Sequence, residues 1–194
     1  MKPSVEYFAF VVDHNGVHPS PRKVQAIREV PVPGNAAELQ SFLGLGNYYR
    51  RFIPDMATIV HPLNRLLLEN APRKWSIQCQ ETFRKLKDIL KSAPLLAHYD
   101  PAKPVSLAVD ASSFRLGAVL SHVRVDQEER PIAFASRTLS SSERNCSMIK
   151  KEALAIIFAL KKFHQYLCLG DILRCKPIIN PWLSYLVQNG GVQS

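Results

Sequence analysis

Short apolar runs separated by turn-forming residues dominate the first half of the chain, and they predict a hairpin followed by helices. The β-rich run at 5–12 precedes Asn15-Gly16, a pair typical of tight hairpin turns because both residues tolerate positive φ. Beyond it, apolar residues recur at helical spacing in four stretches, most of which open with a capping residue. The expected helices cover 20–30, 35–49, 55–68 and 75–93, and Pro62 is expected to kink or divide the third.

The pattern changes after Asp100-Pro101, where three short runs have strand character and suggest an antiparallel meander. These runs are 105–110, 116–123 and 130–135. A long helix is expected from about Ser147 to Cys168, and it is apolar around most of its circumference, as is typical of a helix buried on a sheet. Residues 171–194 show no clear period, and we expect a frayed tail there. The elements together predict an α+β protein.

Charge is the first feature of the composition that points to a partner. The 194 residues include 25 Lys plus Arg against 16 Asp plus Glu, a formal net charge of +9. A polyanion such as nucleic acid is a natural partner for such a chain, and the alternative is a basic, solvated surface without a specific ligand. The hydrophobic content of 46% is that of a globular core and argues against disorder.

The cysteines and the apolar runs bear on the compartment. None of the four cysteines lies in a Cys-x-x-Cys pair, so we interpret them as reduced, intracellular thiols. They are Cys79, Cys146, Cys168 and Cys175. The first residues do not resemble a signal peptide, and no apolar run approaches the ~20 residues needed to cross a bilayer. We therefore expect a soluble intracellular protein without a membrane partner, and the sequence does not distinguish nucleus from cytoplasm.

Two acidic residues stand out by their apolar surroundings. Asp110 ends the apolar run 105–109, and Glu152 lies within the mostly apolar stretch 149–160. A nuclease that uses two metal ions needs carboxylates converging on one point, and these two are the candidates. The ordinary alternatives are a turn initiator for Asp110 and a helix-dipole partner for Glu152.

Several stretches, in order and correctly spaced, resemble the Pol polyprotein of gypsy-class LTR retrotransposons. The first is FLGLGNYYRRFIP at 42–54, which is similar to the segment that follows the palm of the reverse transcriptase. The next are Trp75, Phe83 and PLL at 94–96, which resemble the helix and linker that come after it. The last are VDAS at 109–112, LGAVLS at 116–121, PIAFASR at 131–137, KEALA at 151–155 and KFHQYL at 162–167, which resemble three strands and the first long helix of its ribonuclease H (RNase H) domain.

The resemblance implies a domain organisation. A remnant hairpin of the palm is expected at 1–19, and a helical thumb or connection region at 20–100. The N-terminal half of an RNase H-like domain, with three antiparallel strands and a long helix, is expected at 101–170, followed by a divergent tail at 171–194. The implied fold is thus a small helical region followed by a truncated RNase H-like domain.

The resemblance also implies a chemistry for the two acids. Asp110 and Glu152 match the first aspartate and the helix glutamate of a catalytic carboxylate set that binds two Mg²⁺ (or Mn²⁺) ions and cleaves the RNA strand of RNA–DNA hybrids. Ser112 and Ser113 follow Asp110, where they could contact a ribose 2′-hydroxyl, although turn chemistry explains them equally well.

The nucleic-acid-binding candidates in the first half form one aromatic and cationic run. Arg50 and Arg51 are the phosphate candidates, and Tyr49 lies beside them. Residues in such a run point in different directions on a helix, so we expect at least two of the aromatic side chains, Tyr48, Tyr49 and Phe52, to be in the core.

The sequence departs from the family pattern in ways that affect activity. No Tyr-x-Asp-Asp occurs, so polymerisation by this chain alone is excluded. LRCKPI at 173–178 is the nearest equivalent of the fourth strand, with Arg174 where a third acid should be, and a fourth acid has no equivalent. Metal binding is therefore expected to be weak. Without its strand partner, 105–110 is expected to be an exposed edge through which the chain could self-associate.

Three functions remain open on these grounds. The first is a retroelement-derived fragment that binds nucleic acid and has lost hybrid cleavage. The alternatives are an active RNase H completed by a second chain and a host protein-interaction module. Salt-sensitive nucleic-acid binding, nuclease activity and a stoichiometric protein complex at high salt would respectively distinguish them.

Overall fold

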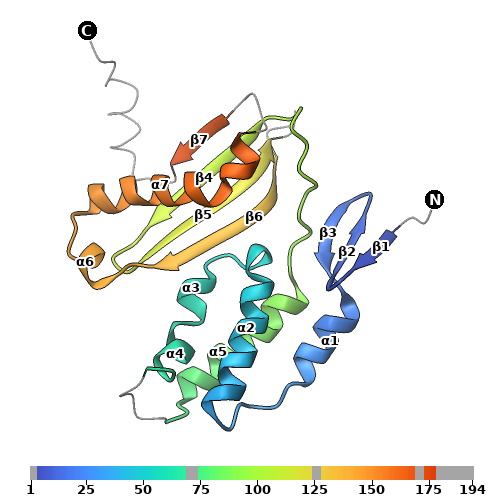
Figure 1. Cartoon of the computed structure of the whole chain (residues 1–194), viewed down its shortest axis with the longest axis vertical. Coiled ribbons are helices and arrows are strands. Elements are labelled where there is room, and N and C mark those ends of the chain that lie inside the picture. Colours follow the sequence, from blue (N-terminus) through green and yellow to red (C-terminus); the bar gives the residue numbers. More distant parts are fainter. Residues whose placement is uncertain (1–3, 69–73, 124–127, 169–172, 178–194) are drawn as a thin grey trace.

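The computed structural model describes residues 4–68, 74–123 and 128–168, and the backbone of 173–177 (Figure 1). The chain forms a helical lobe, from β1 to α5, and a sheet lobe, from β4 to β7. Each lobe has a hydrophobic core of its own. The linker runs from the end of α5 along the sheet lobe to the start of β4 (Figure 1).

The helical lobe opens with a small antiparallel sheet of strands β1 (Ser4–Tyr7), β2 (Phe10–Asp13) and β3 (Gly16–Pro19), in that order. The prediction of one strand over 5–12 is wrong, because the chain reverses at Phe8, which has a φ of 54°. The predicted turn after β2 is present, but it lies one residue earlier than the expected Asn15-Gly16 pair, and Asn15 does not have a positive φ. Its central residues are His14 and Asn15, and Asp13 Oδ1 accepts hydrogen bonds from the backbone N–H groups of Asn15 and Gly16 at 2.8 and 3.1 Å.

The four predicted helical stretches are confirmed. Their helices are α1 (Pro21–Glu29), α2 (Ala36–Tyr48), α3 (Met56–Ile59), α4 (His61–Arg65) and α5 (Ile77–Lys91), and a 3₁₀ turn η1 (Arg50–Phe52) follows α2. Side chains of Asn35 and Ser76 accept the capping hydrogen bonds of α2 and α5. The third stretch is divided just before Pro62, as its ring requires. Local signals thus set most of these boundaries.

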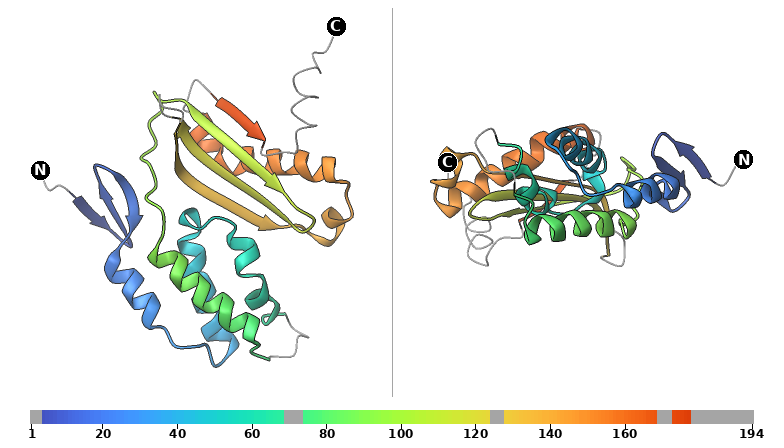
Figure 2. Two further views of the ribbon diagram at one scale, coloured as in Figure 1. Left: turned by 180° about the vertical axis from the view of Figure 1, so that it is seen from behind. Right: turned by 90° about the horizontal axis from the view of Figure 1, so that it is seen from below.

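The sheet lobe is a mixed sheet covered on one face by a long helix. Its strands are β4 (Val105–Ala111), β5 (Arg115–Val123), β6 (Glu129–Thr138) and β7 (Leu173–Pro177), in the order β6-β5-β4-β7. Its helices are α6 (Ser141–Arg144) and α7 (Met148–Leu167). The predicted meander β4-β5-β6 and the long helix are confirmed. Ala155, Ala159 and Phe163 of α7 are buried and belong to the hydrophobic core of the sheet lobe. Figure 2 shows α7 crossing the sheet on one of its faces.

The fourth strand corrects two expectations. β7 pairs in parallel with β4, from Val105 opposite Leu173 to Val109 opposite Pro177. The prediction that β4 is an exposed edge is therefore wrong, and self-association through that edge loses its basis. The expected tail contains a strand at 173–177, while the remainder of the tail prediction lies outside the described residues.

The two lobes meet along β6, against which η1 and α3 lie. The backbone N–H of Ala57 donates to Ser136 Oγ at 3.0 Å, and that of Ala97 donates to the carbonyl of Pro131 at 2.7 Å. Val17 and Leu96 exchange two backbone hydrogen bonds, which tie the N-terminal sheet to the linker. The arrangement brings residues of η1 close to the sheet lobe.

Candidate nucleic-acid and metal sites

Asp110 is held by an arginine. It lies on β4 opposite Gly117, and its Oδ2 is 3.4 Å from Nη2 of Arg115, at the start of β5. Nη1 of the same guanidinium forms a close ion pair with Asp55 of the helical lobe. Arg115 is largely buried, with 18% of its side chain exposed, whereas the two aspartates are about half exposed. One cation therefore links the candidate metal ligand to the other lobe.

The β4–β5 turn is organised by Ser112. Its backbone N–H donates to the carbonyl of Arg115 at 2.9 Å, and its Oγ accepts from the N–H groups of Phe114 and Arg115 at 3.4 and 3.2 Å. These bonds support the turn explanation of Ser112. Ser113 is exposed at the tip of the turn.

Glu152 lies on the sheet-facing side of α7. It is 9% exposed and precedes Ala155 and Ala159, which face the sheet, by three and seven residues. Because α7 begins at Met148, Glu152 lies beyond the first turn, and the helix-dipole alternative is wrong. The Glu152 carboxylate forms no hydrogen bond or ion pair within residues 4–68, 74–123 and 128–168. In the same residues, no side chain binds both Glu152 and Asp110.

A two-metal centre does not fit the residues that the structure describes. Such a centre needs several carboxylates around a combined charge of +4, and among the described residues no group of three or more Asp, Glu, His or Cys is placed to hold a metal ion. Asp110 already has a cationic partner in Arg115. Arg174, which stands where the resemblance implies a third acid, lies opposite Ser106 in the β7 register, four residues before Asp110 on β4.

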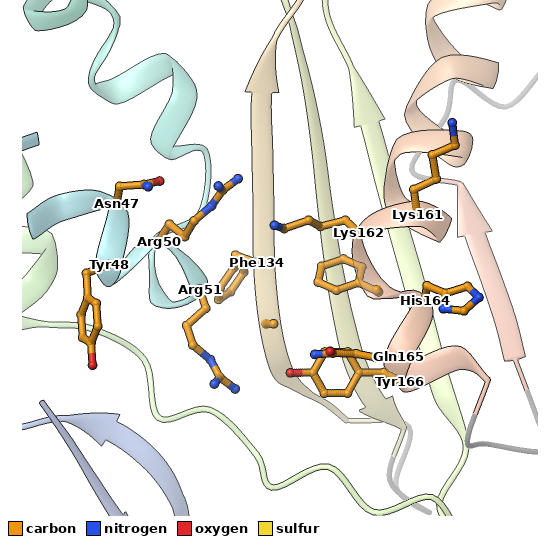
Figure 3. Close-up of a pocket in the computed structure, with 12 residues that line it drawn as sticks. Asn47, Tyr48, Arg50, Arg51, Phe134, Lys161, Lys162, His164, Gln165 and Tyr166 are labelled. Carbon is orange, nitrogen blue, oxygen red and sulfur yellow. The ribbon is translucent and has the colours of Figure 1, made fainter. Parts of the chain in front are cut away.

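A basic cleft of about 520 Å³ lies between η1 and the C-terminal half of α7, over β6 (Figure 3). It is lined by Asn47, Tyr48, Arg50, Arg51, Ala133, Phe134 and the run 161–166. The cationic side chains are those of Arg50, Arg51, Lys161 and Lys162, whereas no carboxylate is among the described residues that line it. The structure thus brings the two predicted arginines together with lysines far away in the sequence.

The aromatic residues beside these arginines divide as expected between core and surface. Tyr49 and Phe52 are buried, with 1% and 0% exposed, and the Tyr49 hydroxyl donates to the carbonyl of Ala9 at 3.4 Å. Burial raises the pKa of Tyr49. Tyr48 is 47% exposed and lines the cleft. Tyr49 is therefore not accessible to a nucleic acid in this conformation, and Tyr48 takes its place as the aromatic candidate.

Sequence reasoning did not select Lys162 or Tyr48 as ligand-binding residues. The signal that could have found the lysine is the pair Lys161-Lys162 directly after the apolar stretch 153–160, where the two charges must reach solvent. Nothing in the local sequence indicates that Arg115 would pair with Asp110 and Asp55.

Comparison with protein families decides the lineage. The family model of the RNase H-like domain found in reverse transcriptase matches residues 75–173, from just before α5 to the start of β7. The chain belongs to this family. It is 41% identical over 175 residues to the retrovirus-related Pol polyprotein from transposon opus of Drosophila melanogaster, covering 84% of this chain and 17% of the relative. It is 40% identical over 178 residues to the Pol polyprotein from transposon gypsy of the same organism, covering 86% and 17%.

Solved structures match the chain in fold. The foamy viral protease-reverse transcriptase in complex with RNA/DNA hybrid matches with a TM-score of 0.79 at 23% identity, covering 99% of this chain and 26% of that chain. A complex of the foamy viral enzyme dRH with dsDNA matches with a TM-score of 0.80 at 24% identity, covering 95% and 32%. The RNase H-like chain spans 17% of the length of the first two curated relatives. In the part of the chain that the structure describes, no helix has the length and apolar character to cross a membrane.

Proposed function

We propose that this RNase H-like chain binds nucleic acid and, by itself, does not cleave RNA–DNA hybrids, the ancestral activity of its lineage. The observation that carries the proposal is the ion pair between Arg115 and Asp110, at 3.4 Å. The family generally uses divalent metals, and the guanidinium competes with any such ion for the carboxylate. Of the two candidate acids, this leaves Glu152, which is too little charge for two divalent ions, and no group of three or more Asp, Glu, His or Cys among the described residues is placed to hold a metal ion.

Nucleic-acid binding is supported by charge and by lineage. The chain carries a net charge of +9, and the cleft collects cations without carboxylates among its described lining residues. The similar foamy viral enzymes are described in complex with dsDNA and with RNA/DNA hybrid. We infer that the partner is an RNA–DNA hybrid or another nucleic acid. We also infer an intracellular location, because the described cysteines are free thiols and thiols stay reduced inside the cell.

The domain assignment is also part of the proposal. We assign 1–19 to a palm hairpin, 20–100 to a thumb or connection region, 101–170 to the RNase H-like half and 171–194 to a tail. The separate cores of the two lobes support the division near 100. The match of the family model from residue 75 indicates that α5 accompanies the RNase H-like region in relatives.

An active RNase H completed by a second chain is the alternative that one observation favours. Glu152 lies on the sheet-facing side of α7 at 9% exposure, and its carboxylate has no hydrogen bond or ion pair among the described residues, so it is free to bind a cation. In that case a second chain would have to supply further carboxylates and Asp110 would have to leave Arg115.

The test is a cleavage assay with an RNA–DNA hybrid labelled on the RNA strand, in Mg²⁺ and separately in Mn²⁺. The control is the double variant Asp110→Asn with Glu152→Gln, and binding is measured in parallel by fluorescence anisotropy. We expect salt-sensitive binding and no cleavage above the control. Magnesium-dependent cleavage that the double substitution abolishes would refute the loss of activity. Absence of binding at low salt would refute the binding function.

A further inference from the structure

We propose that the cleft between η1 and α7 holds one single strand of nucleic acid, with phosphates on Arg50, Arg51 and Lys162 and a base against Tyr48. The inference rests on the proposed nucleic-acid binding and assigns it a place and a strand type. It joins residues of both lobes, more than 100 positions apart in the sequence. The side chains of Arg50 and Lys162 extend toward each other from opposite sides of β6, whereas those of Lys161 and His164 extend away (Figure 3).

The charge of the cleft is uncompensated. In the described part of the chain, neither Arg50, Arg51 nor Lys162 forms an ion pair, and the lining residues include no carboxylate. The cationic side chains around the cleft repel each other. The protein on both sides of the cleft has a low dielectric constant, which strengthens this repulsion. An anion that enters the cleft relieves this repulsion. A chain of phosphates, each with one negative charge, matches cations distributed along two walls.

The arginine donors are positioned but not used. A guanidinium has five N–H groups. In the described structure, Arg50 donates one bond to the carbonyl of Ser136 and Arg51 one to that of Ile132, both at 3.4 Å, which is long for a hydrogen bond. Nε of Arg51 is buried and has no acceptor among the described residues. These contacts orient both side chains on β6, and the N–H groups of the two guanidiniums that make no bond, apart from the buried Nε of Arg51, remain for phosphate oxygens.

The size and the aromatic lining favour a single strand over a duplex. A volume of about 520 Å³ is that of a small-ligand pocket, which accommodates one or two nucleotides but not two paired strands. Phe10 stacks on the ring of Tyr48, with centroids 5.2 Å apart and planes 3° apart, and this fixes the orientation of the ring. Tyr48 remains 47% exposed. A fixed aromatic ring beside a cationic groove is the arrangement on which proteins stack unpaired bases.

The test compares charge-reversal variants of the full chain. Lys162→Glu removes a cation of the cleft, and the matched control Lys85→Glu changes an exposed lysine on α5 that does not line it. Binding is measured by fluorescence anisotropy with a labelled oligothymidylate of about 12 nucleotides and with an RNA–DNA hybrid of equal length. We expect Lys162→Glu to weaken single-strand binding about tenfold and Lys85→Glu less than about twofold. Lys162→Ala should also reduce the slope of log K against log salt by about 0.7.

A second variant tests the strand type. Tyr48→Ala should weaken binding of the single strand about fivefold or more and leave hybrid binding within about twofold, because paired bases cannot stack on the ring. Equal losses for Lys162→Glu and Lys85→Glu would overturn the cleft assignment while nucleic-acid binding stands. Equal effects of Tyr48→Ala on both ligands would overturn the single-strand assignment. If the unsubstituted chain bound neither ligand, the proposed function itself would fail.

Discussion

Glu143 is expected to stabilise the connection between β6 and α7, and Glu143→Gln tests this. Its two carboxylate oxygens accept hydrogen bonds from Nη1 and Nη2 of Arg137 at 2.7 and 2.8 Å, and Oε2 also accepts from the N–H of Ser140 at 2.8 Å. The guanidinium in turn lies over the ring of Phe158 on α7, 5.5 Å from its centroid. The substitution retains the shape of the side chain and removes its charge.

The expected magnitude follows from the pKa of Glu143. The bonds from Arg137, and then the N–H of Ser140, lower this pKa from 4.5 to about 2. At ~1.4 kcal/mol per pH unit this would correspond to ~3 kcal/mol of unfolding free energy. Water screens the pair, because 34% of the Arg137 side chain and 25% of the Glu143 side chain are exposed. We therefore expect Glu143→Gln to lower the free energy of unfolding at pH 7 by about 1–2 kcal/mol.

The pH dependence provides the sharper test. Because the folded pKa lies below the ordinary value, the stabilisation is complete above pH 4.5 and is lost as the pH falls from 4.5 toward 2. Urea unfolding is followed by circular dichroism between pH 7 and pH 3. The difference in free energy of unfolding between the unsubstituted chain and Glu143→Gln should become smaller as the pH falls. The matched control Glu81→Gln changes an exposed glutamate on α5 that has no hydrogen bond or ion pair in the described ranges. Equal stability of the two variants at pH 7, or a difference that persists unchanged at pH 3, would refute the reasoning.

The remaining predictions concern a glycine and the arginine pair. Gly16→Ala should destabilise the chain by about 2–4 kcal/mol in thermal unfolding, because φ is 151° and the new Cβ would lie 2.1 Å from the carbonyl oxygen of Leu96. Gly44→Ala, with nothing within 4 Å of its Cβ, should be neutral or stabilising, and similar losses for both would contradict the first expectation. Replacing Arg50 and Arg51 together by alanine should reduce the single-strand salt slope by about 1.4, and an unchanged slope would place the binding surface elsewhere.

Much of the secondary structure could be predicted because its signals are local. Asn35 and Ser76 accept hydrogen bonds three residues ahead, so their helix starts are encoded within one turn of sequence. The short helix α6 starts with an equally local signal, since Ser140 and Glu143 form a capping box. The chain reversal at Phe8 could not be predicted, because a bulky aromatic residue rarely adopts a positive φ and its residue type gives no local signal for a turn.

The candidate sites divide in the same way. Asp110, Glu152, Arg50 and Arg51 could be selected from motif and context, because each lies in a recognisable local pattern. Their partners could not be selected. Arg115 reaches Asp55 across 60 positions of sequence, and the cleft depends on η1 lying beside α7. Such contacts depend on how the lobes meet at β6, which no local pattern specifies.

The sequence by itself determined the lineage, the α+β composition and the order of the elements, since hydrophobic period, caps and prolines act over a few residues. Only the tertiary structure decided that β7 covers the edge of β4, that Tyr49 is buried while Tyr48 is exposed, and that Asp110 is paired with a cation. The physical reason is that the burial of a side chain and its ion-pair partner depend on segments that are distant in the sequence and pack against it. The same residue can therefore be a ligand or an ion-pair partner, according to its neighbours in space.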